Sequence, residues 1–142
     1  MKLFILSAFT FLFTACATTQ KTTSPQAFNG EWDVVSIQGE KIVPSDKTPY
    51  LGFDVKEQRV YGFTGCNRLT GGINAEELSK GVADFSRMGS TRMACFEDKY
   101  ETKFLSAMGE VAKVKAKGKT LSLCNASGKV VVELVKRDTP RK

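Results

Sequence analysis

The side chains best able to carry chemistry in this sequence are its cysteines, because four are present and histidine is absent. Without histidine, Ser-His-Asp and Cys-His nucleophilic catalysis and every imidazole-ligated zinc site are excluded. The cysteines are widely spaced, so no Cys-X-X-Cys pair is available for thiol redox chemistry or metal binding. No glycine-rich loop ends in the Lys-Ser or Lys-Thr of a phosphate-binding loop. We predict a protein that is not an enzyme and uses no metal or cofactor.

Cys16 lies at the end of a segment with the pattern of an export signal. Residues 1–2 carry a positive charge, and residues 3–13 are apolar but too few to span a bilayer. The run Leu12-Phe13-Thr14-Ala15-Cys16 resembles a bacterial lipobox. That resemblance implies removal of residues 1–15 as a lipoprotein signal peptide and lipidation of Cys16. The alternative, an ordinary signal peptide cut elsewhere, stays open.

Residues 17–27 are rich in threonine, glutamine and serine, a composition typical of a flexible tether. We therefore expect residues 16–27 to be the lipidated cysteine and its tether, and acyl chains there to hold the protein on a membrane. Ala17 is not the aspartate associated with inner-membrane retention in many Gram-negative bacteria. The expected location is the cell envelope, on the outer membrane facing the periplasm.

The other three cysteines would then lie in an oxidising compartment. Because their number is odd, one internal disulfide at most can form. Cys66 and Cys95 both lie in turn-like segments, and we predict that they pair, although both remaining as thiols stays an alternative. Cys124 lies within a predicted strand and has the pattern of a small buried apolar residue.

The charge of the chain argues against nucleic acid as a partner. The net charge is +6, and it would be +5 after removal of the segment that contains Lys2. The lysines are scattered and are not interleaved with aromatic residues. The densest group alternates along one stretch, as the solvated face of a strand does: Lys113, Lys115, Lys117 and Lys119.

Period-2 alternation of apolar residues dominates the chain after the tether and predicts seven or eight short strands. The predicted strands are residues 31–38, 50–55, 59–64, 69–74, 81–87, 120–124 and 129–136. Residues 39–46 are predicted to form a turn. Residues 50–55 and 59–64, joined by a turn at residues 56–58, are predicted to pair as a hairpin. The last two strands, which alternate on both sides of residues 125–128, are predicted to form another.

One segment departs from this pattern. In residues 96–111, Tyr100, Phe104, Met108 and Val111 recur at helical spacing, which predicts a helix that packs on the core. The predicted fold is mainly β: a small antiparallel barrel-like or curled sheet with one helix packed on it. We assign residues 28–137 to this domain and residues 138–142 to a C-terminal tail.

Two motifs resemble those of a known family. Residues 63–72, FTGCNRLTGG, resemble the GCNR-x-x-G segment of the META domain family, the HslJ-like bacterial heat-shock lipoproteins. Residues 88–95, MGSTRMAC, resemble that family's M-x-[ST]-T-[RK]-M-A-C segment. The resemblance covers about residues 28–136. It implies a small β-rich fold with one helix, and a role in envelope maintenance or in tolerance of stress and antibiotics.

A disulfide between Cys66 and Cys95 would bring the two motifs together. Asn67 and Arg68 would then lie near Thr91 and Arg92, and two guanidinium groups beside an amide and a hydroxyl can bind an anion. The alternative is that Asn67 and Thr91 satisfy turn backbone groups while the arginines pair with acids such as Asp84 or Glu97.

The sequence leaves two main functions open. The first is a non-enzymatic, lipid-anchored envelope protein that binds an envelope protein partner. The second is a carrier that holds a small apolar ligand in a β-barrel cavity. Inhibition of a secreted protease by an exposed loop is a third possibility, with less support.

Overall fold

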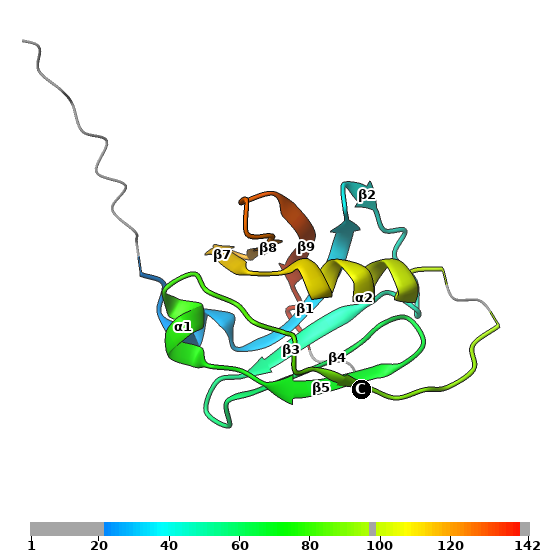
Figure 1. The fold of residues 1–142 in the computed structure, drawn as a ribbon, viewed down its shortest axis with the longest axis horizontal. Coiled ribbons are helices and arrows are strands. Elements are labelled where there is room, and N and C mark those ends of the chain that lie inside the picture. Colours follow the sequence, from blue (N-terminus) through cyan, green and yellow to red (C-terminus); the bar gives the residue numbers. More distant parts are fainter. Residues whose placement is uncertain (1–21, 97–98, 140–142) are drawn as a thin grey trace, which may run out of the picture.

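Alternating apolar residues build one large antiparallel sheet in the computed structural model, which describes residues 22–96 and 99–139. Nine strands take part in the order β6-β5-β4-β3-β1-β9-β8-β7, with β2 paired to β1 (Figure 1). Their bounds are β1 Gly30–Ile37, β2 Glu40–Lys41, β3 Tyr50–Asp54, β4 Arg59–Phe63, β5 Arg68–Gly72, β6 Gly89–Ser90, β7 Lys113–Lys117, β8 Thr120–Cys124 and β9 Val130–Lys136.

The predicted hairpins are confirmed. β3 pairs with β4 around the turn at residues 55–58, and β8 pairs with β9 around residues 125–129. Leu51, Phe53 and Val55 are all buried, as their alternation predicts. Within the segment expected to be a turn, β2 forms a small hairpin with β1, because Gln38 and Gly39 both adopt the left-handed backbone of a tight primed turn.

The sheet is curled, not closed into a barrel, and a single crossing segment joins its two edges. Val82 forms an isolated bridge with Lys113 of β7, at one end of the strand order. A few residues later, Gly89 and Ser90 pair with β5 at the other end. The two edges therefore approach each other without a continuous ladder of hydrogen bonds. The curled sheet with a packed helix confirms the predicted fold class.

That crossing segment corrects the strand predicted over residues 81–87. Only Val82 bridges another strand there. The Asp84 carboxylate accepts a hydrogen bond from the Ser86 N–H, and the Met88 N–H donates to the Phe85 carbonyl, so the chain turns instead of extending. A short helix that was not predicted, α1 (Ala75–Ser79), precedes it, and Asn74 caps this helix by accepting from the Glu76 and Glu77 N–H groups.

Helix α2 (Glu101–Glu110) packs its apolar stripe on β9 and β1. Tyr100, Phe104, Met108 and Val111 are buried, as their helical spacing predicts. The helix begins five residues later than the predicted segment, and the disulfide-bonded Cys95 lies directly before that segment. Of residues 97 and 98 nothing is described.

At the start of the described chain, the 3-10 helix η1 (Pro25–Phe28) packs Phe28 into the core. The Trp32 indole donates to the Phe28 carbonyl over 2.8 Å, and the Thr23 N–H donates to the Ser79 carbonyl. Residues 23–28, most of which we expected to belong to the tether, are thus held by the domain. Cys16 lies outside the described residues. No helix of the described part of the chain is long and apolar enough to cross a membrane.

Candidate functional site

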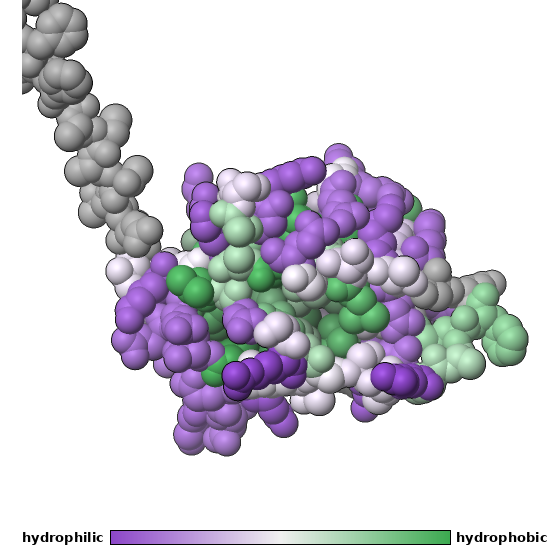
Figure 2. Space-filling model, in the orientation of Figure 1, coloured by the Kyte–Doolittle hydropathy of each residue, from purple (hydrophilic) through white to green (hydrophobic). Residues whose placement is uncertain are grey.

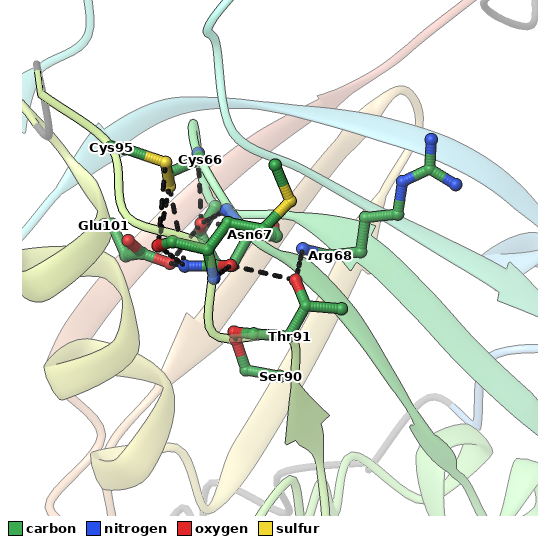
Figure 3. The surroundings of a disulfide bond; sticks show 9 residues. Cys66, Asn67, Arg68, Ser90, Thr91, Cys95 and Glu101 are labelled. Atoms are coloured by element: carbon green, nitrogen blue, oxygen red, sulfur yellow. Dashed lines mark hydrogen bonds between the residues drawn. A yellow bond between two sulfur atoms is a disulfide. The ribbon is translucent and has the colours of Figure 1, made fainter.

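A disulfide between Cys66 and Cys95 joins the two sequence motifs, as predicted, with Cα atoms 6.0 Å apart (Figure 3). Cys66 follows β4 in the turn that leads into β5, and Cys95 lies in the loop between β6 and α2. Cys124 remains free and buried in β8, also as predicted. The bond anchors a loop with no regular structure of its own to the body of the sheet.

Asn67 is the centre of the hydrogen bonds beneath this disulfide. Its side-chain oxygen accepts from the Met93 N–H over 2.6 Å and from the Thr91 hydroxyl over 2.9 Å. Its amide nitrogen donates to a Glu101 carboxylate oxygen over 2.7 Å and to the Met93 carbonyl over 3.5 Å. Asn67 is buried, so these bonds use the amide fully and fix the loop at Thr91 and Met93.

Thr64 and Glu101 form the other half of the cluster. The Thr64 hydroxyl donates to the Glu101 carboxylate over 2.8 Å, a pairing that could in principle activate a nucleophile. However, Thr64 has no exposed surface, and its hydroxyl oxygen also accepts from the Cys66 and Asn67 N–H groups. A hydroxyl held in this way positions a turn and is closed to substrate.

The predicted anion patch is brought together only in part. Asn67 and Thr91 are in contact, and the Arg68 N–H donates to the Thr91 hydroxyl over 3.0 Å. The Arg68 side chain points away from both of them (Figure 3). Arg92 is exposed. The polar groups of Asn67 and Thr91 are already engaged with backbone, as the alternative interpretation expects, and anion binding by the arginines stays a prediction.

The sequence suggested Asp84 and Glu97 as partners of Arg68 and Arg92, and the structure leaves that pairing undecided. Asp84 accepts from Ser86, and this hydrogen bond, with a smaller contribution from Arg87, lowers the pKa of the Asp84 carboxyl. Glu97 lies outside the described residues. Within residues 22–96 and 99–139, neither Arg68 nor Arg92 forms a salt bridge.

The loop held by this cluster exposes apolar side chains. Met93 is 63% exposed and Phe96 is fully exposed, and they flank the disulfide-bonded Cys95. Figure 2 shows an apolar projection at the right of the molecule, where Figure 1 draws the loop before α2. Sequence reasoning did not identify these two residues as surface features, and it assigned Phe96 to the start of the predicted helix.

Two shallow depressions border the loop. One, of about 760 Å³, lies between residues 88–94 and α2 and includes Thr102 and Leu105. The other, of about 500 Å³, is lined by Val43, Tyr100 and Phe96 together with Lys47 and Lys99. In the second, the Val43 N–H donates to the Tyr100 hydroxyl over 3.2 Å. Both depressions are open to solvent and are lined by apolar and polar side chains.

A second ionic cluster, which the sequence analysis did not find, lies on the outer face of the sheet. Arg137, just after β9, pairs with Glu31 and Asp33 of β1, and its guanidinium carbon lies 4.8 Å from the centre of the Tyr50 ring. The hydrogen bond with Asp33 is the main cause that raises the pKa of Arg137. The Tyr61 hydroxyl reaches Glu31 over 3.5 Å. Arg137 at the end of β9 thus bridges two acidic side chains of β1, and we interpret this cluster as a clamp between β9 and β1.

Metal chemistry finds no support in the part of the chain that the structure describes. No group of three or more cysteine, aspartate or glutamate side chains there could hold a metal ion.

The chain is similar to one known protein family in sequence and to two solved structures in fold. The sequence profile of a family described as META domain matches residues 15–138. No curated protein matches the sequence significantly. A protein solved by NMR shares 19% identity at a TM-score of 0.54, covering 80% of this chain and 93% of that one. A DUF4847 family protein from Bacteroides vulgatus shares 14% identity at a TM-score of 0.51, covering 80% and 96%. At these identities the two structures show a common fold.

Proposed function

This chain belongs to the META domain family, and from that premise we propose that it is a lipid-anchored envelope protein that acts by binding a protein partner and not by catalysis. The observation that carries this proposal is the loop of residues 91–96. An exposed methionine and an exposed phenylalanine are fixed there by a disulfide and by Asn67.

The loop has the properties of a binding hot spot. Exposed aromatic and methionine side chains are enriched at the centres of protein interfaces. Phe96 is fully exposed, so it contributes no hydrophobic burial to the stability of the isolated domain. Its apolar surface would be buried only when a partner covers it. The disulfide and the Asn67 bonds restrain the loop before binding, which reduces the entropy lost when a partner docks.

The envelope location rests on the N-terminal sequence and is supported by the disulfide. Cys16 ends a run that resembles a lipobox, and Ala17 after it favours the outer membrane. Disulfides persist in the periplasm and are rare in the cytosol, so the Cys66–Cys95 bond agrees with export. A role in envelope maintenance or in tolerance of stress and antibiotics follows from the family resemblance.

Partner binding is tested by placing a photo-crosslinking amino acid at position 96 of the full-length chain in its own host. A matched position is Lys56, which is exposed in the turn between β3 and β4. We expect a discrete protein adduct from position 96 that is absent from position 56 and is reduced in a Met93→Ser background. Adducts of equal pattern from both positions, or none from either, would contradict the proposal.

The anchor is tested separately by mass spectrometry of the N-terminal peptide. We expect a peptide that begins at Cys16 and carries acyl chains, and a Cys16→Ala chain that is neither acylated nor cut at that point. An unmodified N-terminus in the wild-type protein would remove the envelope proposal but leave the binding loop unaffected.

The carrier alternative finds less support in the packing. Trp32, Phe53 and Phe104 are at most 1% exposed and belong to one continuous core cluster. These large side chains fill the inner face of the curled sheet, which an apolar ligand would have to enter. The exposed loop therefore favours a protein partner over a ligand held inside.

A further inference from the structure

The outward face of β7 carries a row of three lysines. Lys113, Lys115 and Lys117 are exposed, whereas Val114 and Ala116 between them face the core. Within residues 22–96 and 99–139, none of the three forms a salt bridge. The neighbouring Lys80 and Lys119, by contrast, pair with Glu76 and Asp138. The row therefore presents positive charge that acids on the described domain do not neutralise by contact.

The acidic group that shares this face across the ladder does not cancel the row. Ser122 of β8 pairs with Lys115 on one side and with Glu133 of β9 on the other. One strand therefore separates Lys115 from Glu133, a spacing of roughly 10 Å. At that distance an exposed pair is largely screened at physiological salt. Lys113 and Lys117 have the buried Cys124 and the uncharged Thr120 as their partners in β8.

The chain enters the domain beside this row. Thr22 and Thr23 line a depression of about 480 Å³ together with Lys113 and Lys115. The Thr23 N–H donates to the Ser79 carbonyl, which holds the entering chain at the end of α1. Val82, nearly half exposed, lies in the same depression and bridges Lys113. Figure 1 shows the first described residues near α1 and β7, at the left of the view.

We propose that the Lys113-Lys115-Lys117 face lies against the anionic phospholipid headgroups of the membrane that holds the anchor. This inference rests on the lipid anchor of the proposed function. Only five residues separate Cys16 from Thr22, so a fully extended chain places the two at most roughly 20 Å apart. Each lysine beside an anionic leaflet favours contact by about fivefold in the equilibrium constant. A short anchor that enters beside three such lysines orients the domain.

The orientation has a consequence for the binding loop. Figure 1 places residues 91–96 at the right of the view, opposite the end where the chain enters. With the chain anchored beside β7, this loop lies at the end of the molecule far from the anchor, where a partner can reach it.

The test is lysine acetylation of the mature acylated protein, reconstituted in vesicles and read by mass spectrometry. One set of vesicles is pure phosphatidylcholine, and the other is phosphatidylcholine mixed with an equal part of phosphatidylglycerol. We expect Lys113, Lys115 and Lys117 to react several-fold more slowly on the anionic vesicles, and the protection to disappear at high salt. Lys56, Lys99 and Lys103 should react at the same rate on both.

The same digest reports the mass of the N-terminal peptide, which separates the two ideas. Equal reactivity of the three β7 lysines on both vesicles, with Cys16 acylated, would overturn the orientation and leave the anchor intact. A row that contacts another protein or a nucleic acid would give that result. Absence of acylation would instead count against the proposed function. Lys80 lines the same depression as Lys113 and should also react more slowly on the anionic vesicles. The K113Q/K115Q/K117Q variant should lose this protection of Lys80, whereas the K56Q/K99Q/K103Q variant should retain it.

Discussion

At the scale of single residues, Asn67 does more to shape the site than either arginine beside it. Its amide joins the backbone of the Met93 loop to the Glu101 carboxylate of α2, so one buried side chain links the sheet, the loop and the helix. The disulfide fixes one point of the same loop, at Cys95. The conformation of the exposed loop depends on both.

The Asn67→Ala substitution is expected to lower the free energy of unfolding by about 2–3 kcal/mol, because the Met93 N–H loses its acceptor in a partly buried place. Urea unfolding with the disulfide intact measures the change. Arg68→Ala is the matched control, since Arg68 is exposed and adjacent, and it should stay within about 0.5 kcal/mol of wild type. An Asn67→Ala protein as stable as Arg68→Ala would show that the cluster does not hold the loop.

Tyr61 on the outer face makes a prediction about alkaline pH. Burial, and then the charge of Glu31, raise the pKa of the Tyr61 hydroxyl above its ordinary value near 10. A raised pKa in the folded state means that Tyr61 adds stability below about pH 10 and that this stability is lost as the pH rises further. Absorbance titration at 295 nm should show a component above pH 10 that Tyr61→Phe removes. Loss of a component at lower pH would contradict this account.

The sequence predicted the disulfide but not the cluster beneath it. Cys66 and Cys95 are distinctive residue types in turn-like segments, so their pairing was accessible from the sequence. Glu101 lies near the start of the predicted helix, where any acid is favourable, so its residue type does not single it out. Its contact with Thr64 and Asn67 depends on how α2 lies on the sheet, and no local pattern encodes a contact between residues more than 30 positions apart.

At the scale of elements, the strands follow the sequence closely wherever two alternating runs are neighbours in the chain. The β3–β4 and β8–β9 hairpins were predicted because alternation and turn residues agree there. The strand predicted over residues 81–87 was wrong. Ala83 and Phe85 are buried but belong to no paired strand, and the apolar pattern of such a segment resembles that of a strand. Helix α1 is five residues long and carries too little periodicity, although Asn74 followed by two glutamates is a cap signal.

Substitution by alanine is expected to have opposite effects on stability at Gly62 and at Gly109. A Cβ added at Gly62 of β4 would lie 2.4 Å from the Tyr50 carbonyl oxygen, a backbone atom that cannot move without shifting β3. We expect Gly62→Ala to destabilise the fold by more than about 2 kcal/mol. At Gly109 in α2 nothing lies within 4 Å of an added Cβ, and Gly109→Ala should stabilise by about 0.5 kcal/mol. Thermal unfolding of both variants measures this, and equal effects would contradict the close pairing of β3 with β4.

At the scale of the whole molecule, two opposite ends have different characters. The end where the chain enters presents three lysines on β7, and the other end presents Met93 and Phe96. Between them lies one continuous core of buried apolar side chains. Such a division suits a protein that connects a surface at one end with a partner at the other.

We expect the stability difference between wild type and a variant without the β7 lysines to change sign between detergent and anionic vesicles. In detergent at low salt, three like charges repel along one face of β7, so K113Q/K115Q/K117Q should be more stable than wild type by about 0.5 kcal/mol. High salt should remove the difference, because screening shortens the reach of the repulsion. On phosphatidylglycerol vesicles the order should reverse, since the headgroups bind the folded wild-type face and stabilise it by linkage. Thermal unfolding under the three conditions measures this, with K56Q/K99Q/K103Q as the control. If the triple variant also remained the more stable protein on anionic vesicles, β7 would be a solvated edge strand and nothing more.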